Sequence, residues 1–474
     1  MYQFDIFKAF KTYNLDSRQR RPNNNNNNGG STTNEDLEAV LRFGVEEQFC
    51  SCSSGCVEDA VVALPNARLV STNFHSDDVE AASTEVTHMV TQWGQFLDHD
   101  VVLTPEEEAH DCCHDDSDQY CMQIAVPGDD YFYSEHDVGC LEFSRSVGFC
   151  EEDIAINSPE HNQLNAITAF VDASNVYGSS EEQSEPLRAL DGSGKMLVEG
   201  ANLLPIVDET GERKAGDVRG LEMPGLATMH TLFVREHNRI CDELKDHRDV
   251  DSSWTDEDFF QNARRILIAE MQKIVYDEYL PVVMGDKGME NWDLKLSRDS
   301  KYDSNADPSI SNSFATAAYR FGHSMIQGLI EMYTTTDLTE TQSYELGNNY
   351  FDLTNYEAND GLGMEQILTG LCKQAAQNMD RHVTVETTNK LFANTGETPG
   401  VGGDLVARNI QRGRDHGLPS YAAFYREFGP DDQDAMDCWD LKPSQIEQEN
   451  WDLLKTLYQH PHHIGLYVKA CLKS

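Results

Sequence analysis

Basic residues are scarce in this chain of 474 residues. Only 36 Lys and Arg stand against 82 Asp and Glu, so the formal net charge is −46 at pH 7. A surface this acidic repels the phosphates of nucleic acids and the headgroups of anionic lipids. The composition therefore argues against a nucleic-acid partner.

Long hydrophobic runs are also missing. No apolar stretch approaches the roughly 18 residues that a membrane-spanning helix needs, and the first 20 residues lack the unbroken apolar stretch of a secretory signal. No repeated unit is visible either. Hydrophobic residues still make up 39% of the chain, which is enough to bury a large core. The sequence thus predicts a globular protein without a membrane span.

Cysteine is concentrated near the beginning of the chain. Because no Cys-x2-Cys pair faces a second one, a structural zinc site is not favoured, although the segment CSCSSGC at 50–56 is an alternative site for a soft metal. Uneven spacing in loop-like sequence favours disulfides, and hence a secreted or lumenal protein. Loop lengths favour one bridge from Cys121 to Cys112 or Cys113, and a second bridge from the remaining one of these two to Cys140.

The chain divides into a polar beginning and a globular remainder. Residues 1–36 include six consecutive asparagines, and they cannot bury enough apolar surface to offset the entropy of ordering. We expect them to form a disordered tail, followed by a cysteine-bearing lead-in at 37–64. Residues 104–160 are rich in loop-forming and acidic residues, with short extended pieces at most.

Helical periodicity dominates the sequence after residue 160. The predicted helices span 226–247, 256–284, 312–332, 363–380 and 446–459. In the first of them, apolar residues recur at steps of three and four, with charged residues between them. Asp256 is the expected N-cap of the second. These patterns predict a mainly α fold in one large body.

The densest group of polar side chains lies in THMVTQWGQFLDHDVVLTP, residues 87–105. If this segment is a helix, Gln95 and His99 share one face and Asp98 lies beside them. Polar groups at the end of an apolar helix are costly unless they are solvated or used. The alternative interpretation is a helix end that frays into an acidic loop.

A second segment offers oxygen ligands on alternate residues. Thr168, Phe170 through its carbonyl, Asp172 and Ser174 could supply four ligands to a hard cation such as calcium, which takes six to eight oxygens. The spacing is not that of an EF-hand, so Asp100 or another distant carboxylate would have to complete the shell. The alternative is an ordinary Asp/Ser turn.

Three further segments combine charged groups with small residues. Arg219 and Glu222 flank a turn, and His323 stands among alanines and a glycine that leave room for a flat group. A core histidine is the alternative for His323. Arg412 and Arg414 lie in a basic stretch of a very acidic chain, and their guanidinium groups suit carboxylate partners.

In order and content, these segments resemble the animal haem peroxidases, the peroxidase–cyclooxygenase superfamily. The resemblance runs from about residue 66 to residue 470 and rests on the motifs WGQFLDHD, FVDASNVYG, LEMP, REHNR, YRFGH and RGRDHGLPSY. Within the family the chain looks closest to peroxinectin- and peroxidasin-like enzymes. The resemblance implies one haem peroxidase domain over 65–474 that is incomplete at its C-terminus, because family members usually continue further.

The resemblance also implies roles for the residues on either side of a haem b. His323 would be the proximal iron ligand, and Asn409 would accept its other ring N–H. His99 would be the distal base, which takes a proton from hydrogen peroxide and returns it to the leaving hydroxide. Arg219 would stabilise the negative charge that develops, and Gln95 would orient a distal water or a halide.

Further roles follow from the same resemblance. Arg320 and Arg412 would pair with the haem propionates, and Asp98 and Glu222 would form ester bonds to haem methyl groups. Met223 matches the position that forms a sulfonium link in myeloperoxidase, with a plain core methionine as the alternative. The implied calcium ligands are Asp100, Thr168, Phe170, Asp172 and Ser174.

The implied activity is the reduction of hydrogen peroxide coupled to the oxidation of a halide, pseudohalide or phenolic donor. An extracellular-matrix or cell-surface partner is implied by the peroxinectin-like and peroxidasin-like relatives. One alternative is a catalytically silent adhesion or matrix relative. Another is a fatty-acid dioxygenase of the same fold, which would use a tyrosyl radical three residues before the proximal histidine. Here that position is Arg320, and Tyr319 lies one step away.

Overall fold

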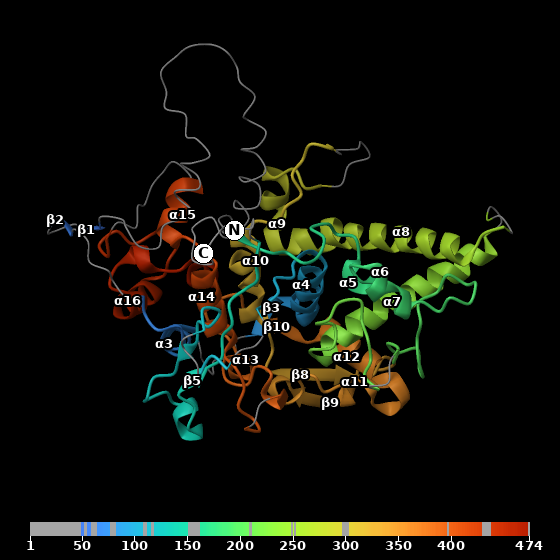
Figure 1. Ribbon diagram of the computed structural model, residues 1–474, viewed down its shortest axis with the longest axis horizontal. Coiled ribbons are helices and arrows are strands. Elements are labelled where there is room, and N and C mark those ends of the chain that lie inside the picture. The colour runs from blue at the N-terminus through green and yellow to red at the C-terminus, as the bar shows by residue number, and fades with distance from the viewer. Residues whose placement is uncertain are drawn as a thin grey trace, which may run out of the picture.

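The computed structural model describes residues 49–51, 55–57, 64–75, 82–107, 111–114, 118–149, 162–207, 211–247, 250, 253–295, 303–395, 398–428 and 438–472. The predicted tail at 1–36 lies outside these residues, as does most of the lead-in. The described part is mainly helical, as the sequence predicts (Figure 1). Its longer helices are α4 (His88–Val101), α7 (Pro224–Asp246), α8 (Asp256–Ile274), α9 (Leu280–Asn291), α12 (Leu362–Lys373), α14 (Leu405–Asp415), α15 (Tyr421–Phe428) and α16 (Gln448–Leu457).

Strands are short and occur in antiparallel pairs within the described residues. The pairs are β1 (Phe49–Ser51) with β2 (Gly55–Val57), β3 (Ala82–Thr87) with β10 (Ala375–Gln377), β4 (Ile124–Ala125) with β5 (Cys140–Leu141), β6 (Gly148–Phe149) with β7 (Asn162–Gln163), and β8 (Leu329–Tyr333) with β9 (Glu340–Glu345). In the first pair Cys50 lies opposite Cys56. The two described ends of the segment considered as a soft-metal site are thus paired as antiparallel strands.

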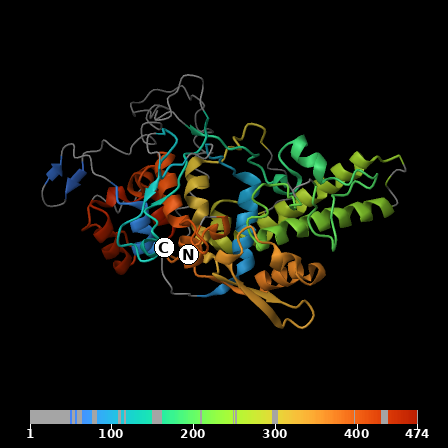
Figure 2. The ribbon, with the colours of Figure 1, turned by 60° about the horizontal axis from the view of Figure 1, so that its bottom comes forward.

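A large core forms where α4 packs against α7 and α12, and α7 packs against α8. The helices bury the apolar stripe that the sequence shows, with Phe96 of α4 and Phe233 of α7 stacked at 5.1 Å between ring centroids. Figure 2 shows α4 between the α7–α8 pair on one side and the C-terminal helices on the other. A second apolar cluster joins α3 (Ala67–Val70), α14 and α17 (Leu466–Ala470). None of the described helices is long and apolar enough to cross a membrane.

Three predicted helices differ from the structure. Helix α8 is capped by Thr255, not by Asp256, because Thr255 and Asp258 form a reciprocal capping box. The helix predicted over 312–332 is replaced by the short α10 (Asn312–Thr316), the 3-10 helix η5 (Ala318–Met325) and strand β8. The helix predicted over 363–380 ends at Lys373, and β10 follows it.

Two disulfides between described residues brace the loop-rich segment between α4 and α5 (Ser174–Tyr177). Cys112 bonds to Cys121, and Cys113 bonds to Cys140. The structure therefore decides between the two alternatives that loop lengths left open. The backbone N–H groups of Cys112 and Cys113 also donate to the carboxylate of Glu142, at 2.8 and 3.0 Å.

A buried ion pair positions helix α14, which carries part of the candidate site. The side chain of Arg68 is fully buried, and its Nε and Nη1 donate to Asp130 and Asp404 at 2.7 and 2.8 Å. Asp404 is also the N-cap of α14 and accepts the N–H of Ala407 at 2.9 Å. Removing one partner of such a buried pair leaves an uncompensated charge, so Arg68 holds the start of α14 in place.

Candidate haem-binding site

The last turn of α4 carries three consecutive acidic or basic residues into the protein interior. His99 is 4% exposed and Asp100 is fully buried, because Phe96 on the same helix is anchored in the core. Gln95 lies one turn earlier, where its Oε1 accepts from Gln92 at 3.4 Å. The helix prediction for this segment is confirmed, and the end of the helix is buried instead of frayed.

The turn before α7 brings Arg219 to this end of α4. Its Nη2 lies 3.5 Å from the carbonyl oxygen of His99, and its Nη1 lies 4.0 Å from Oδ2 of Asp98. Asp217, which the sequence reasoning did not single out, holds the guanidinium group from the other side with two hydrogen bonds of 2.8 Å. We call His99, Asp98, Arg219, Asp217 and Glu222 the distal cluster.

Burial governs the electrostatics of the distal cluster. Burial, together with the charge of Asp217, raises the pKa of Asp98 to about 6 despite the nearby arginines. Burial likewise raises the pKa of Glu222 to about 7, against the attraction of Arg219. Burial, and then the positive charge of Arg219, lowers the pKa of His99 well below its usual range. His99 is therefore a neutral imidazole, the form that can accept a proton.

A second group of polar side chains lies on η5 and α14. Burial lowers the pKa of His323 to about 3, with Arg320 adding to the effect, so this imidazole is neutral as a metal ligand must be. The amide nitrogen of Asn409 lies 2.8 Å from Nδ1 of His323, and Arg320 donates from Nη1 to the amide oxygen at 2.5 Å. The sequence-based expectation had the oxygen of Asn409 facing His323, but Arg320 takes that oxygen here.

The two groups face each other across one interior region. Helix α4 packs against η5, and Thr91 of α4 donates to the carbonyl of Met325 at 3.3 Å. Asp98 is close enough for its ionisation to be favoured by both Arg219 and Arg320. A methyl group built on Gly322, next to His323, would meet no atom within 4 Å. There is thus open space at Gly322, the residue before His323.

Arg412 lies close enough to Arg320 to act on its pKa, but it is bound by other groups. Its guanidinium group is bound by Glu106, by Asp415 and by the carbonyl of Ser144, and it lies over the ring of Phe143. These partners bind Nη1 and Nη2 of Arg412. Arg320 is free of carboxylate partners among the described residues and is the better candidate for that contact.

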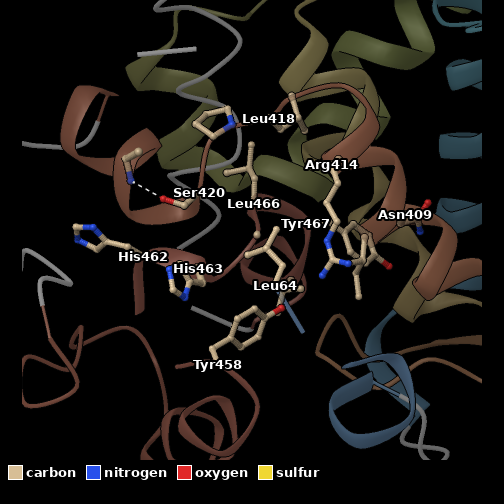
Figure 3. A pocket seen from close by; sticks show the side chains of 16 residues that line it. Leu64, Asn409, Arg414, Leu418, Ser420, Tyr458, His462, His463, Leu466 and Tyr467 are labelled. Atoms are coloured by element: carbon tan, nitrogen blue, oxygen red, sulfur yellow. Dashed lines mark hydrogen bonds between the residues drawn. The ribbon is translucent and has the colours of Figure 1, made fainter. Parts of the chain in front are cut away.

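Met223 and Arg414 belong to neither of the two groups of side chains described above. Met223 is the N-cap residue of α7 and packs against the large core, so the alternative of a plain core methionine stays open. Arg414 lines a cavity of about 110 Å³ together with Tyr467 and Asn409 (Figure 3). Of the predicted site residues only Asn409 lines this cavity, which is therefore separate from the distal cluster.

The candidate calcium loop closes directly on the end of α4. Oδ2 of Asp100 accepts the N–H groups of Asp172 and Ala173, and its Oδ1 accepts the hydroxyl of Ser174 at 3.1 Å. Thr168 donates to the carboxylate of Asp172 at 3.0 Å. Burial, and then the charge of Asp172, raises the pKa of Asp100 to about 7. A divalent cation between these oxygens would offset the repulsion of the two carboxylates.

Phe170 belongs to the same loop, with its side chain 58% exposed. An exposed aromatic ring in a loop is consistent with a residue that contributes its carbonyl and not its side chain. Four of the five predicted ligands, Asp100, Thr168, Asp172 and Ser174, are joined by the hydrogen bonds described above. The structure brings these four together although Asp100 and Asp172 are 72 residues apart.

We expect calcium to stabilise the protein through this loop. A ligand at 100 times its dissociation constant adds about 2.7 kcal/mol to the free energy of unfolding, so calcium should raise the midpoint of thermal unfolding and a chelator should lower it. Asp100→Asn should abolish the response, whereas the control Asp307→Asn, in an exposed turn where Asp307 accepts from Ser309, should retain it. An equal response in both variants would remove Asp100 from the cation site.

The comparison with known families identifies the family of the chain. The model of the animal haem peroxidase family matches residues 23–473. The chain belongs to the animal haem peroxidase family. The chain is 33% identical over 445 residues to peroxidasin from Drosophila melanogaster, with 87% of the chain and 28% of that protein covered. It is 34% identical over 407 residues to myeloperoxidase from Mus musculus, with 79% of the chain and 53% of that protein covered.

Solved structures share the fold of this chain. Peroxidase A from Dictyostelium discoideum superposes with a TM-score of 0.70 at 27% identity and covers 90% of this chain and 81% of its own. A fatty acid alpha-dioxygenase from Oryza sativa has a TM-score of 0.67 at 18% identity, covering 91% of this chain and 71% of its own, which shows likeness of fold alone. The chain spans 28% of the length of the fly peroxidasin and 58% of the length of heme peroxidase 2 from Caenorhabditis elegans.

Proposed function

We propose that this chain is a haem-dependent peroxidase that reduces hydrogen peroxide while it oxidises a halide, a pseudohalide or a phenolic donor. The observation that carries the proposal is the pairing of a neutral, buried His99 with the cationic Arg219 on one side of the site. A neutral histidine can accept a proton from peroxide, and an adjacent arginine can stabilise the developing negative charge. His323 and Asn409 complete the site on the other side.

The residues present fit a haem. Haem b would supply the redox chemistry, and the neutral imidazole of His323 would hold its iron through Nε2. A methyl group on Gly322 would meet no atom within 4 Å, so the backbone next to His323 leaves room for a bound group, and Arg320 would bind a propionate. Gln95 would orient a water or a halide beside His99.

The orientation of the Asn409 amide bears on how His323 would bind iron. Ligation through Nε2 leaves the ring hydrogen on Nδ1, so Nδ1 must donate. The amide of Asn409 would have to turn by half a revolution to present its oxygen to Nδ1 and would then release Arg320. The released guanidinium group would be free to bind a propionate.

Location and partners belong to the proposal as well. The two disulfides, Cys112–Cys121 and Cys113–Cys140, support an oxidising compartment, and we propose an extracellular protein. A partner in the extracellular matrix or on the cell surface would fit that location. Calcium would bind at the loop of Asp172 and brace the helix end that carries His99.

The purified protein loaded with haem tests the proposed function. We expect a Soret band together with peroxide-dependent oxidation of guaiacol. A Soret band without guaiacol oxidation would favour the silent matrix relative. Oxygen consumption with a fatty acid would favour the dioxygenase, although Arg320 stands where those enzymes carry a tyrosine and the hydroxyl of Tyr319 contacts Tyr279 at 3.4 Å.

Covalent attachment of haem is a separate prediction that depends on Asp98 and Glu222. Both carboxyl groups are partly buried and lie within the electrostatic reach of Arg219, and family members form esters at these positions. After brief exposure to peroxide, haem should stay with the polypeptide through acid–acetone extraction. Asp98→Ala and Glu222→Ala should each leave one link, and the double variant should release its haem.

The outcome of the extraction separates three possibilities. Complete release of haem from the peroxide-treated wild type would refute the ester prediction. Retention in the double variant would indicate a bond from Met223, which Met223→Leu would test. The intact mass under denaturing conditions gives the number of haem groups attached and needs no assay of activity.

A further inference from the structure

Asp217 is the most constrained charged residue of the distal cluster, and the family resemblance gave it no role. It is 6% exposed. Its Oδ1 accepts both the backbone N–H and Nε of Arg219, at 2.9 and 2.8 Å, and its Oδ2 accepts Nη2 at 2.8 Å. Three hydrogen bonds therefore run from one carboxylate to a single arginine.

These bonds determine which part of Arg219 is left for a substrate. A carboxylate that binds Nε and Nη2 side-on fixes the plane of the guanidinium group. Nη1 is the nitrogen that Asp217 does not bind, and it is directed toward Asp98, 4.0 Å from Oδ2. Asp217 thus holds Arg219 so that one particular donor faces the interior of the site.

Asp217 also lies near His99, on the side of the ring that carries Nδ1. Its Oδ1 lies 3.9 Å from Nδ1 of His99, and this Nδ1 is buried without a hydrogen-bond partner among the described residues. A negative charge on that side favours the tautomer with hydrogen on Nδ1, as the aspartate of a catalytic triad does. The lone pair is then left on Nε2, the other ring nitrogen.

We propose that Asp217 is a positioning residue of the distal site, which orients Nη1 of Arg219 and keeps the hydrogen of the His99 ring on Nδ1. This inference rests on the proposed peroxidase function for its catalytic consequence. The orientation itself is a property of the polypeptide. The carboxylate of Asp217 would thus control both the orientation of Arg219 and the tautomer of His99, the two groups that would act on peroxide.

A structural role in the turn is the alternative. Gly220 donates its N–H to the carbonyl of Asp217 at 3.0 Å, so Asp217 shapes the turn before α7 as well. Asp217→Asn separates the two roles, because an asparagine Oδ1 still accepts the N–H of Arg219 while the negative charge is lost. Asp130→Asn is the matched control, since Asp130 is a buried partner of Arg68 that lies outside the distal cluster.

The first measurement uses the full chain without added haem. With ¹⁵N-labelled histidine, the signal missing from His99→Gln identifies His99, and its ¹⁵N shifts report which ring nitrogen carries the hydrogen. We expect hydrogen on Nδ1 in the wild type and in Asp130→Asn, and a measurable population with hydrogen on Nε2 in Asp217→Asn. The same tautomer in all three proteins would overturn the inference.

The second measurement uses the haem-loaded protein and hydrogen cyanide, a neutral acid that must give up a proton to a base before it binds iron as an anion. We expect Asp217→Asn to slow cyanide binding roughly 10- to 100-fold, the range usual for a partner that orients a ligand or catalytic group, with the Soret band unchanged. Asp130→Asn should bind cyanide like the wild type. An unchanged rate in Asp217→Asn, with stability lost as in Asp130→Asn, would assign Asp217 to the turn alone and overturn the proposal.

The two measurements keep the inference distinct from the proposed function. If the wild type fails to oxidise any donor with peroxide, the proposed function is wrong, and the tautomer of His99 still decides the role of Asp217. If the wild type is active and the tautomer does not change in Asp217→Asn, only the role of Asp217 is refuted.

Discussion

Replacing His323 with alanine should remove the Soret band of the haem-loaded protein or shift it to that of unligated haem. The proposed iron bond runs through this imidazole, which burial keeps neutral. The loss should appear at equilibrium in an absorption spectrum, without any assay of turnover. It is the largest effect that we expect from one substitution.

A control and a rescue make this result specific. His237→Ala removes another buried histidine, which is bonded to Tyr177 at 2.8 Å, and it should reduce stability while the Soret band remains. His323→Gly should recover the band when free imidazole is added, because the open space at Gly322 adjoins the gap that the substitution creates. A normal haem spectrum in His323→Ala would show that the ligand is a different residue.

His99→Ala should leave haem bound but slow the cleavage of the peroxide O–O bond. A positioned general base contributes roughly 10² to 10⁴ in rate, so we expect a loss of at least that size in a stopped-flow measurement with hydrogen peroxide. Arg219 would still be present, which is why some reaction should remain.

The other end of the same helix supplies the control for His99. His88 is also buried on α4, and its Nε2 accepts the N–H of Gln327 at 3.3 Å. His88→Ala should lower the free energy of unfolding without changing the rate with peroxide. Equal rates in His99→Ala and the wild type would exclude His99 from proton transfer.

The helices could be predicted well where one amphipathic pattern continues, as in α7. The pattern failed at 312–332, because Ala317 leaves the helical conformation with φ −132° and ψ −59°. Strand β8 follows instead, with Ile330 and Met332 buried and Leu329 exposed, and it pairs with β9. Strand pairing depends on a partner elsewhere in the chain, which a local periodicity does not contain.

The site could be predicted only where single residues carry a recognisable motif. His99, Arg219 and His323 lie in such motifs. Asp217 does not stand out, because one aspartate among 82 acidic residues carries no signal of its own. The contact between Arg412 and Glu106 could not be predicted from the sequence either, since the two residues lie 306 positions apart.

Asp98, His99 and Asp100 are consecutive residues of α4, and each is assigned a different partner: haem, peroxide and calcium. Successive residues of an α-helix point about 100° apart, so one turn can serve three directions at once. Because all three residues lie on one helix, a shift in the register of α4 would displace all three side chains. Inserting a single alanine after Phe96 would rotate all three side chains together, and we expect haem attachment, proton transfer and cation binding to be lost in one step. Among related chains, we therefore expect insertions and deletions in the loops around α4 but none in its last two turns.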